Sequence, residues 1–356
     1  MTRYAVLTPP GTGAIAVLTV SGPDAWPLVL RRFRPAGKPL PESPALHAVR
    51  LGTLGDGAGD EVVVAVTQVT PAVTVEVHCH GGPQVVRMLC DLLDAEGCRR
   101  AEWWELARGD DFVAEVLPFL VAAPTVRNAS ILLDQYRGAF REVVRSLQVD
   151  LERGELDAVG ERLERLRQLV PVGSHLVKAW DVVLVGTPNA GKSSLVNAIA
   201  GYQRSVVTPI AGTTRDAVRV ELAIDGVAVR LTDTAGLRDT SDLLEAEGVR
   251  RATALMASAD LVVYVLDGTA PAPIPNGHEL VVWNKADLVA APPGVLAVSA
   301  TTGQGLRELM SRIVATLEPA QPRPGEAVPF GPYCAMLGQA GDDSVPIVTR
   351  LANGFN

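Results

Sequence analysis

The feature that most constrains the fold is a glycine-rich loop between an apolar strand and a helix. We expect the strand over 181–185, and it runs directly into Gly186-Thr-Pro-Asn-Ala-Gly-Lys-Ser-Ser194, which fits the pattern GxxxxGK followed by Ser or Thr. In this setting the glycines let backbone N–H groups surround a phosphate, and the N-terminus of the following helix adds partial positive charge. We therefore predict a nucleotide-binding α/β domain over 179–318, built as a doubly wound, mostly parallel sheet.

Side chains around this loop match the needs of a triphosphate and its metal ion. Lys192 is expected to reach the β- and γ-phosphates and is one of two catalytic candidates, and the Ser193 hydroxyl is expected to bind Mg²⁺. Further along, the Thr214 hydroxyl completes the Mg²⁺ shell, Asp233 can hold a magnesium-bound water, and the Gly236 N–H can meet the γ-phosphate. The remaining loop residues expected to line the nucleotide are Asn189, Ala190, Gly191 and Ser194.

Two later motifs indicate that the base is guanine. Asn284-Lys-Ala-Asp287 follows an apolar strand expected over 279–283. The Asp287 carboxylate can accept two hydrogen bonds from guanine N1–H and the 2-amino group, and the stem of Lys285 can pack over the ring. Ser299 and Ala300 end the next strand, where the Ala300 N–H can reach the guanine carbonyl. Because the motifs occur in the order of a guanine-nucleotide switch, the sequence predicts GTP and GDP binding.

Hydrolysis needs a group that orients the attacking water. Many switch GTPases use a glutamine directly after the glycine of the Asp-x-x-Gly motif, but Leu237 stands here and cannot hydrogen-bond. The acidic candidates in the following segment are Asp242, Glu245 and Glu247, which can equally form the solvated start of a helix.

Composition limits the remaining classes of function. The 32 basic and 40 acidic residues give a formal net charge of −8, so any RNA contact has to come from a local patch or a partner. No apolar run approaches about 18 residues, which argues against a membrane span. The four cysteines lack CxxC spacing, a usage typical of free thiols in a reducing cytoplasm.

The pattern outside 179–318 predicts three further parts. We expect an α+β domain over 1–103, a shortened helical module over 104–178 and an irregular C-terminal tail over 319–356, which is rich in Pro and Gly. Between the apolar strands at 261–267 and 279–283, eleven residues with three prolines leave no room for the usual crossover helix. In the first domain, strands are expected at 14–20, 61–66 and 73–77, and helices at 23–33 and 83–96.

Several of these segments resemble the MnmE/TrmE family of bacterial tRNA-modification GTPases. The resemblance rests in the nucleotide domain on 186–194, on Val207-Thr-Pro-Ile-Ala-Gly-Thr-Thr-Arg-Asp216 and on Asp233-Thr-Ala-Gly-Leu-Arg238. Near the N-terminus it rests on Thr8-Pro-Pro-Gly-Thr-Gly-Ala-Ile-Ala16, Val20-Ser-Gly-Pro-Asp24 and Val75-Glu-Val-His-Cys-His-Gly-Gly82.

This resemblance implies a specific catalytic arrangement. It implies K⁺ ligation by Asn189, Thr208, Ile210 and Thr213, which would supply positive charge where other systems insert an arginine. It also implies that Glu245 is the residue that orients the water, which makes Glu245 the second catalytic candidate.

The resemblance also implies partners and a second ligand. Family members pair through their G domains and their N-terminal domains, bind a formyl-tetrahydrofolate, and act with an FAD-dependent partner on carbon 5 of the wobble uridine of tRNA. Glu76 fits the family's folate-binding carboxylate, whereas Thr19 stands where an arginine is expected, and a hydroxyl cannot replace a guanidinium fork.

Two hypotheses follow for the whole chain. The first is a cytoplasmic GTPase of the tRNA-modification type. The alternative is a degenerate paralogue acting as a GTP-dependent interaction switch without modification chemistry. The alternative is favoured by Thr19 and by the final residues Leu351-Ala-Asn-Gly-Phe-Asn356, which lack the family's Cys-x-Gly-Lys motif. The nearby His78-Cys79-His80 also suggests zinc, but no other His/Cys cluster completes a tetrahedral set, so a structural role is favoured.

Overall fold

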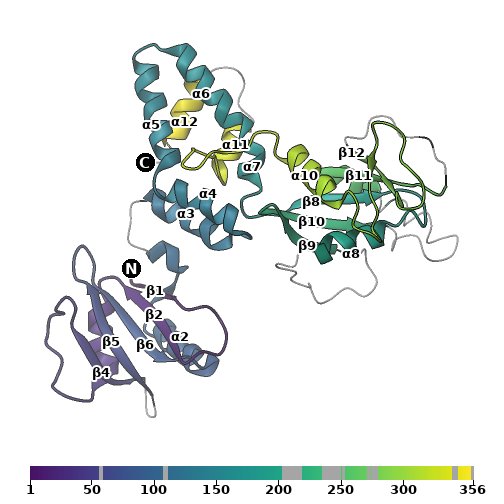
Figure 1. Cartoon of the computed structure of the whole chain (residues 1–356). Helices are drawn as coiled ribbons and strands as arrows, with labels where there is room; N and C mark the ends of the chain where they lie inside the picture. The colour runs from purple at the N-terminus through teal and green to yellow at the C-terminus, as the bar shows by residue number, and fades with distance from the viewer. Residues whose placement is uncertain are drawn as a thin grey trace. The chain divides into compact units, whose positions relative to one another are not determined.

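The computed structural model describes residues 1–55, 59–106, 111–202, 219–234, 250, 253–270, 273, 280–338 and 344–353. The chain divides into two compact units, Met1–Asp110 and Asp111–Asn356. The second unit contains the helical module and the nucleotide (G) domain, so the two parts share one unit while each keeps its own apolar core (Figure 1).

The first unit is a mostly antiparallel sheet with helices on one face. Its strand order is β3-β4-β5-β6-β2-β1-β7, and among the strands in the described part of this unit only the β1–β7 pair is parallel. Side chains alternate between the two faces of each strand, so a buried residue is followed by a more exposed one along β6. The elements are β1 (Arg3–Val6), β2 (Ile15–Ser21), α1 (Ala25–Arg32), β3 (Phe33–Pro35), β4 (Val49–Leu54), β5 (Asp60–Gln68), β6 (Thr74–His80), α2 (Pro83–Ala95), β7 (Arg99–Arg100) and the 3₁₀ helix η1 (Trp103–Leu106).

Residues after 103 belong to this unit rather than to the helical module. The short helix η1 contacts β1 and β2. Arg3 on β1 forms an ion pair with Glu105 on η1, with 3.6 Å between Nη1 and Oε2. The expected boundary at 103 is therefore too early, because the segment that follows it packs on the first two strands.

The helical module is completed by the C-terminal segment. Its helices are α3 (Asp111–Ala122), α4 (Val126–Tyr136), α5 (Ala139–Glu152), α6 (Leu156–Gln168), α7 (Val170–Ser174), α11 (Pro332–Gly338) and α12 (Ser344–Asn353). The expectation of an irregular tail over 319–356 is wrong, because α12 packs on α5 and α6, and α11 packs on α6 and α7 (Figure 1). Phe330, Tyr333 and Leu351, each at most 1% exposed, share one core cluster with Phe140 and Leu147 of α5.

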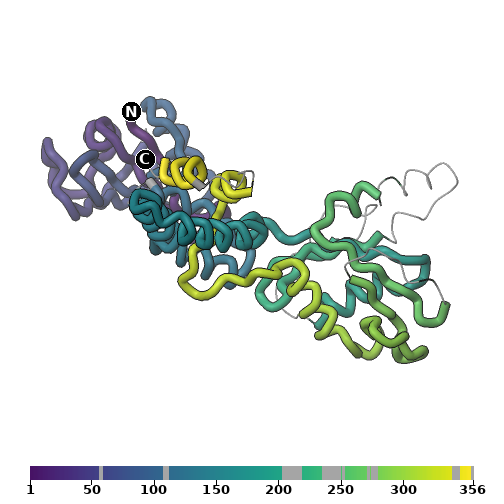
Figure 2. Tube along the Cα trace, turned by 90° about the horizontal axis from the view of Figure 1, so that it is seen from above, coloured from purple at the N-terminus to yellow at the C-terminus, as the bar shows by residue number. Residues whose placement is uncertain are grey.

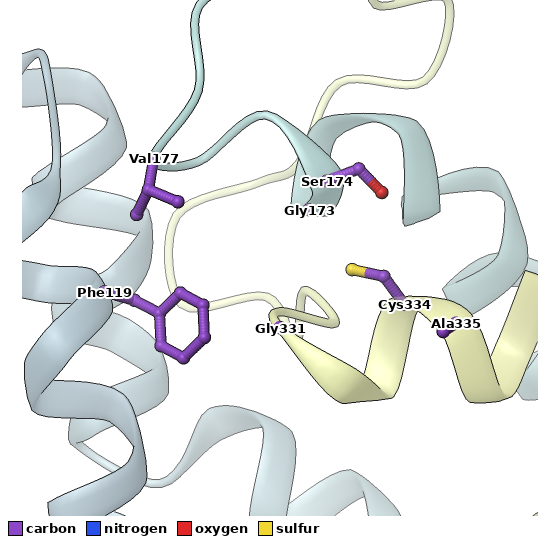
Figure 3. Close-up of a pocket in the computed structure, with 7 residues that line it drawn as sticks. All are labelled: Phe119, Gly173, Ser174, Val177, Gly331, Cys334 and Ala335. Atoms are coloured by element: carbon purple, nitrogen blue, oxygen red, sulfur yellow. The ribbon is translucent and has the colours of Figure 1, made fainter.

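A cavity of about 360 Å³ lies in this module where the chain leaves α7 for the G domain. In Figure 3, Phe119 and Val177 line one side of the cavity, and Ser174 and Cys334 lie together on the other. Burial raises the pKa of the Cys334 thiol to about 11, although a hydrogen bond with Ser174 opposes this shift. The thiol is therefore protonated at neutral pH and is a poor nucleophile.

The described residues of the G domain form a six-stranded sheet in the order β13-β12-β11-β8-β10-β9, and among these strands only the β9–β10 pair is antiparallel. Two helices, α8 and α10, pack against the same apolar cluster on this sheet. The connection expected to lack a helix lies mostly at 271–272 and 274–279, outside the described residues. The elements are β8 (Trp180–Val185), α8 (Lys192–Tyr202), β9 (Arg219–Ile224), β10 (Val227–Asp233), β11 (Leu261–Asp267), β12 (Leu280–Asn284), β13 (Leu296–Ala297) and α10 (Leu306–Leu317).

Residues at the start of α4 bind both segments that connect the helical module to the G domain. Figure 2 shows the chain passing from the helical module into the G domain and returning after α10. Arg127 donates to both carboxylate oxygens of Glu318, at 3.0 and 2.6 Å, where α10 ends. Asn128 donates through Nδ2 to the carbonyl oxygens of residues 175 and 176, each at 3.0 Å, where the chain enters. The G domain is thus an insertion whose entry and exit are fastened to one helical turn.

Candidate nucleotide site

The glycine-rich loop joins the end of β8 to the start of α8. Gly186 has φ +150°, and a Cβ there would lie 2.1 Å from the Val265 carbonyl oxygen, so only glycine fits this approach of two strands. Gly191 has φ +85°, and a Cβ there would lie 2.4 Å from Asn284 Nδ2. Lys192 is 5% exposed and donates through Nζ to the carbonyl oxygens of Gly186 and Thr187, at 3.1 and 2.9 Å. The loop therefore closes around the ammonium group that is expected to meet phosphate.

The two expected Mg²⁺-side groups in the described residues meet directly. The Ser193 hydroxyl donates to Oδ2 of Asp233, although the two residues come from α8 and β10. Asp233 is 1% exposed, whereas Ser193 is exposed. A hydroxyl beside a buried carboxylate at the carboxyl ends of parallel strands is an oxygen donor set that suits Mg²⁺.

Asn284 joins the phosphate loop to the guanine loops. Its Nδ2 donates to the Ala190 carbonyl oxygen at 2.8 Å, and its Oδ1 accepts from the Ala300 N–H at 3.3 Å. Asn284 is 2% exposed and Ala190 is fully buried. The sequence predicted that the motif beginning at Asn284 recognises the base. In the structure, the Asn284 side chain links this motif to the phosphate loop and to the loop that carries Ala300.

The position of Lys285 depends on its backbone conformation and on a contact of its ammonium group. Lys285 has φ +62°, a left-handed conformation uncommon for a residue with a Cβ. Its Nζ lies 2.7 Å from Oδ2 of Asp267 at the end of β11. Burial raises the pKa of the Asp267 carboxyl, but hydrogen bonds from Lys285 and Thr269 outweigh burial and hold this pKa below its ordinary value.

The other residues predicted to lie on the base side are Asp287, Ser299 and Ala300. Asp287 is exposed, so its carboxylate is open to a ligand. Ser299 is fully buried, and its Oγ accepts from the Thr302 N–H at 3.1 Å, which shapes the loop that presents Ala300. Of the other loop residues, Asn189 has φ +64° and is exposed, as is Ser194.

Several predicted residues lie outside the described residues. They are Thr208, Ile210, Thr213 and Thr214 in 203–218, and Gly236 and Glu245 in 235–249. Their assignments to Mg²⁺, K⁺, the γ-phosphate and the attacking water stay predictions.

In the N-terminal unit, Glu76 lies on the sheet face opposite α1 and α2. It pairs in register with Thr19 on β2, and its Oε2 lies 3.3 Å from His78 Nε2. Thr19 is 6% exposed. Across the described part of the chain, no group of three His, Cys, Asp or Glu side chains is arranged to hold a metal ion.

Sequence reasoning missed Asp267 and Thr269. Asp267 ends an apolar strand, as Asp233 and Asn284 do, and the carboxyl ends of parallel strands meet at one edge of the sheet. The position of Asp267 at the end of an apolar strand was the sequence signal that could have identified it.

The loop, the Ser193–Asp233 contact and the guanine loops define a P-loop GTPase. Residues 181–292 match the family model described as 50S ribosome-binding GTPase. Residues 2–108 match the model described as GTP-binding protein TrmE N-terminus.

Three proteins that align with most of this chain share the name tRNA modification GTPase MnmE. The chain is 35% identical over 370 residues to tRNA modification GTPase MnmE of Thermotoga maritima, an alignment covering 88% of this chain and 81% of that protein. It is 36% identical over 355 residues to the Synechococcus sp. (strain RCC307) protein of that name, covering 85% and 78%. For the Nitratidesulfovibrio vulgaris protein the identity is 34% over 400 residues, covering 95% and 87%. The chain belongs to the MnmE family of tRNA modification GTPases, as its motifs predicted. Within the described ranges, every helix is too short or too polar to traverse a bilayer.

Proposed function

We propose that this GTPase is Mg²⁺-dependent and K⁺-stimulated and that it serves modification of carbon 5 of the wobble uridine in tRNA, together with an FAD-dependent partner. The observation that carries the proposal is that the carboxyl ends of four strands meet at one site. They bring together the loop after β8, Asp233 at the end of β10, Asp267 at the end of β11 and Asn284 at the end of β12. The relatives' name supports the tRNA substrate.

The described residues account for binding and orientation. The loop over 186–191 surrounds the phosphates with N–H groups, and Lys192 places its ammonium group against their negative charge. Ser193 and Asp233, whose side chains meet, would hold Mg²⁺ between the phosphate loop and the end of β10. When bound, Mg²⁺ neutralises charge that builds on the phosphate oxygens. Asp287 accepts from the guanine edge, which adenine does not match.

In this proposal, Asn189 of the phosphate loop would be a ligand of K⁺, and the bound ion would supply further positive charge near the transferred phosphate. Thr208, Ile210 and Thr213 are the other ligands, and Thr214 completes the Mg²⁺ shell. Glu245 orients the attacking water, since Leu237 cannot.

The cation assignment is tested by GTP turnover in KCl and in NaCl at equal ionic strength. K⁺ should raise turnover of the wild type and of Asn197→Ala, which alters an exposed asparagine of α8 away from the loop. Asn189→Ala should lose the difference between the two salts. Equal wild-type rates in both salts would remove K⁺ from the proposal.

The role in tRNA is tested by complementation. The chain is expressed in a bacterium that lacks its own family enzyme, and wobble nucleosides are analysed by mass spectrometry. Restored modification supports the proposal. Intact GTP hydrolysis without modification supports the second candidate, a GTP-dependent interaction switch, which the loss of an arginine at Thr19 favours. Size-exclusion chromatography with and without a GTP analogue tests pairing of two copies through the N-terminal and G domains.

Formyl-tetrahydrofolate fits the described residues only in part. Glu76 offers a half-buried carboxylate. Thr19, opposite Glu76, supplies no cation for the carboxylates of the folate. We therefore derive no step through folate.

A further inference from the structure

Asp267 is a buried carboxylate at the nucleotide edge of the sheet. It is the last residue of β11 and pairs in register with Asn284, the last residue of β12. Its side chain is 8% exposed. A buried carboxylate persists only where its charge is balanced and its oxygens are hydrogen-bonded.

Both oxygens of this carboxylate are engaged, and by different groups. Oδ1 accepts from the N–H and the hydroxyl of Thr269, at 2.9 and 2.6 Å. Oδ2 accepts from Lys285 Nζ at 2.7 Å. Because Thr269 fixes the plane of the carboxylate, the position of Oδ2 is set before the ammonium group meets it.

The backbone around Lys285 is fixed as well. The Gly268 N–H donates to the Asn284 carbonyl oxygen at 3.0 Å, and the Ala286 N–H donates to the Val298 carbonyl oxygen at 3.0 Å. A Cβ at Gly268 would lie 2.6 Å from Trp283 Nε1, so the end of β11 packs directly on the guanine loop. With its backbone and its head group both held, the stem of Lys285 has little freedom.

We propose that Asp267 is a positioning residue for guanine-nucleotide binding. It holds Lys285 by its ammonium group so that the aliphatic stem is already extended where the base packs, and Thr269 orients the carboxylate for this task. The entropy of ordering a long side chain is then lost on folding and not on binding. The inference rests on the proposed role of Lys285 at the base.

The test is a double-mutant cycle on the full chain, read out as the dissociation rate of a fluorescent GDP analogue. Asp267→Asn keeps the shape and an acceptor for Thr269 but loses the charge. We expect about tenfold faster dissociation for Asp267→Asn and for Lys285→Met. The double variant should be no faster than Lys285→Met alone, because each change removes the same interaction.

The matched control is Asp181→Asn. Asp181 is the second residue of β8, at the end of the strand away from the phosphate loop, and accepts from Arg230 Nη1 at 2.8 Å. This variant should lower thermal stability and leave GDP dissociation at the wild-type rate. A role of Asp267 in folding alone would give Asp267→Asn the same result as this control, which would overturn the inference.

Other outcomes are equally decisive. If the two single effects multiply in the double variant, Asp267 and Lys285 act independently and the inference fails. If Lys285→Met itself leaves dissociation unchanged, the proposed role of Lys285 fails instead. If Asp267→Asn does not fold, Thr269→Val repeats the test: about twofold to threefold faster dissociation is expected, and an unchanged rate would overturn the inference.

Discussion

Replacing Leu351 by alanine tests whether the C-terminal helix is a structural part of the helical module. Leu351 lies on α12, is fully buried, and belongs to the core cluster that contains Leu147 of α5. The change removes about three methylene equivalents at ~0.8 kcal/mol each and leaves a cavity. We expect the free energy of unfolding of the module to fall by about 3 kcal/mol.

Amide hydrogen exchange followed by mass spectrometry measures this effect locally. If the helices of the module open together, a loss of about 3 kcal/mol accelerates exchange of the α5 amides roughly 100-fold. The matched control is Val345→Ala on the same helix, where the side chain is 48% exposed. This control should change stability by less than about 0.5 kcal/mol. The G domain has its own apolar cluster, so GTP turnover should persist in both variants.

One comparison would refute the reasoning. Leu147→Ala on α5 should accelerate exchange across α5 whatever α12 does. If Leu147→Ala accelerates exchange and Leu351→Ala does not, α12 contributes nothing to the core, and the packing of the C-terminal segment on α5 is not a property of the folded protein.

Three further changes have defined outcomes. Gly160 lies in helix α6, and a Cβ at this position would meet no atom within 4 Å. Gly160→Ala should therefore raise the free energy of unfolding by about 1 kcal/mol, measured as a higher urea midpoint. Gly186→Ala places a Cβ 2.1 Å from the Val265 carbonyl oxygen, so calorimetry should show a less stable G domain, and GDP binding should be lost; a variant that binds GDP normally would contradict the loop geometry. The hydrogen bond from Arg165 lowers the pKa of Glu326 in the folded protein. The ionised Glu326 therefore stabilises the fold fully at pH values above the ordinary glutamate pKa of about 4.3, and this stabilisation is lost as the pH falls through the lower pKa of the folded state. Glu326→Gln should therefore flatten the acid side of the stability profile, and an unchanged acid side would assign that loss to other carboxylates.

The parts predicted well from sequence are those whose chemistry is local. The loop over 186–194 has a glycine at each place where a Cβ would collide, so its residue types report its shape. Strand β8 before the loop and strand β11 later in the chain are runs of apolar residues, a pattern that indicates burial on both faces.

The C-terminal helices could not be predicted in this way. Helix α11 is seven residues long and α12 is ten, lengths at which a helix in isolation is marginal. Pro332 begins α11, where the missing N–H costs nothing, yet in the sequence it joins a run of helix-breaking residues. These helices exist because α5 and α6 cover them, and that contact joins segments nearly 200 residues apart.

Asp267 was missed for a related reason. Its partner Lys285 follows it by 18 residues, and nothing in either local pattern pairs them. Only the parallel register of β11 and β12, which brings Asp267 beside Asn284, places the carboxylate next to the guanine loop.

The insertion of the G domain has a consequence for how the chain is made. Helices α3 to α7 leave the ribosome before the G domain, while the apolar faces that Phe330, Tyr333 and Leu351 will later cover are still exposed. At about 5–20 residues per second, synthesis of the intervening G domain takes on the order of ten seconds. During that interval the nascent helical segment is a substrate for chaperones and proteases. Co-translational survival of this protein therefore depends on how quickly its last helices arrive.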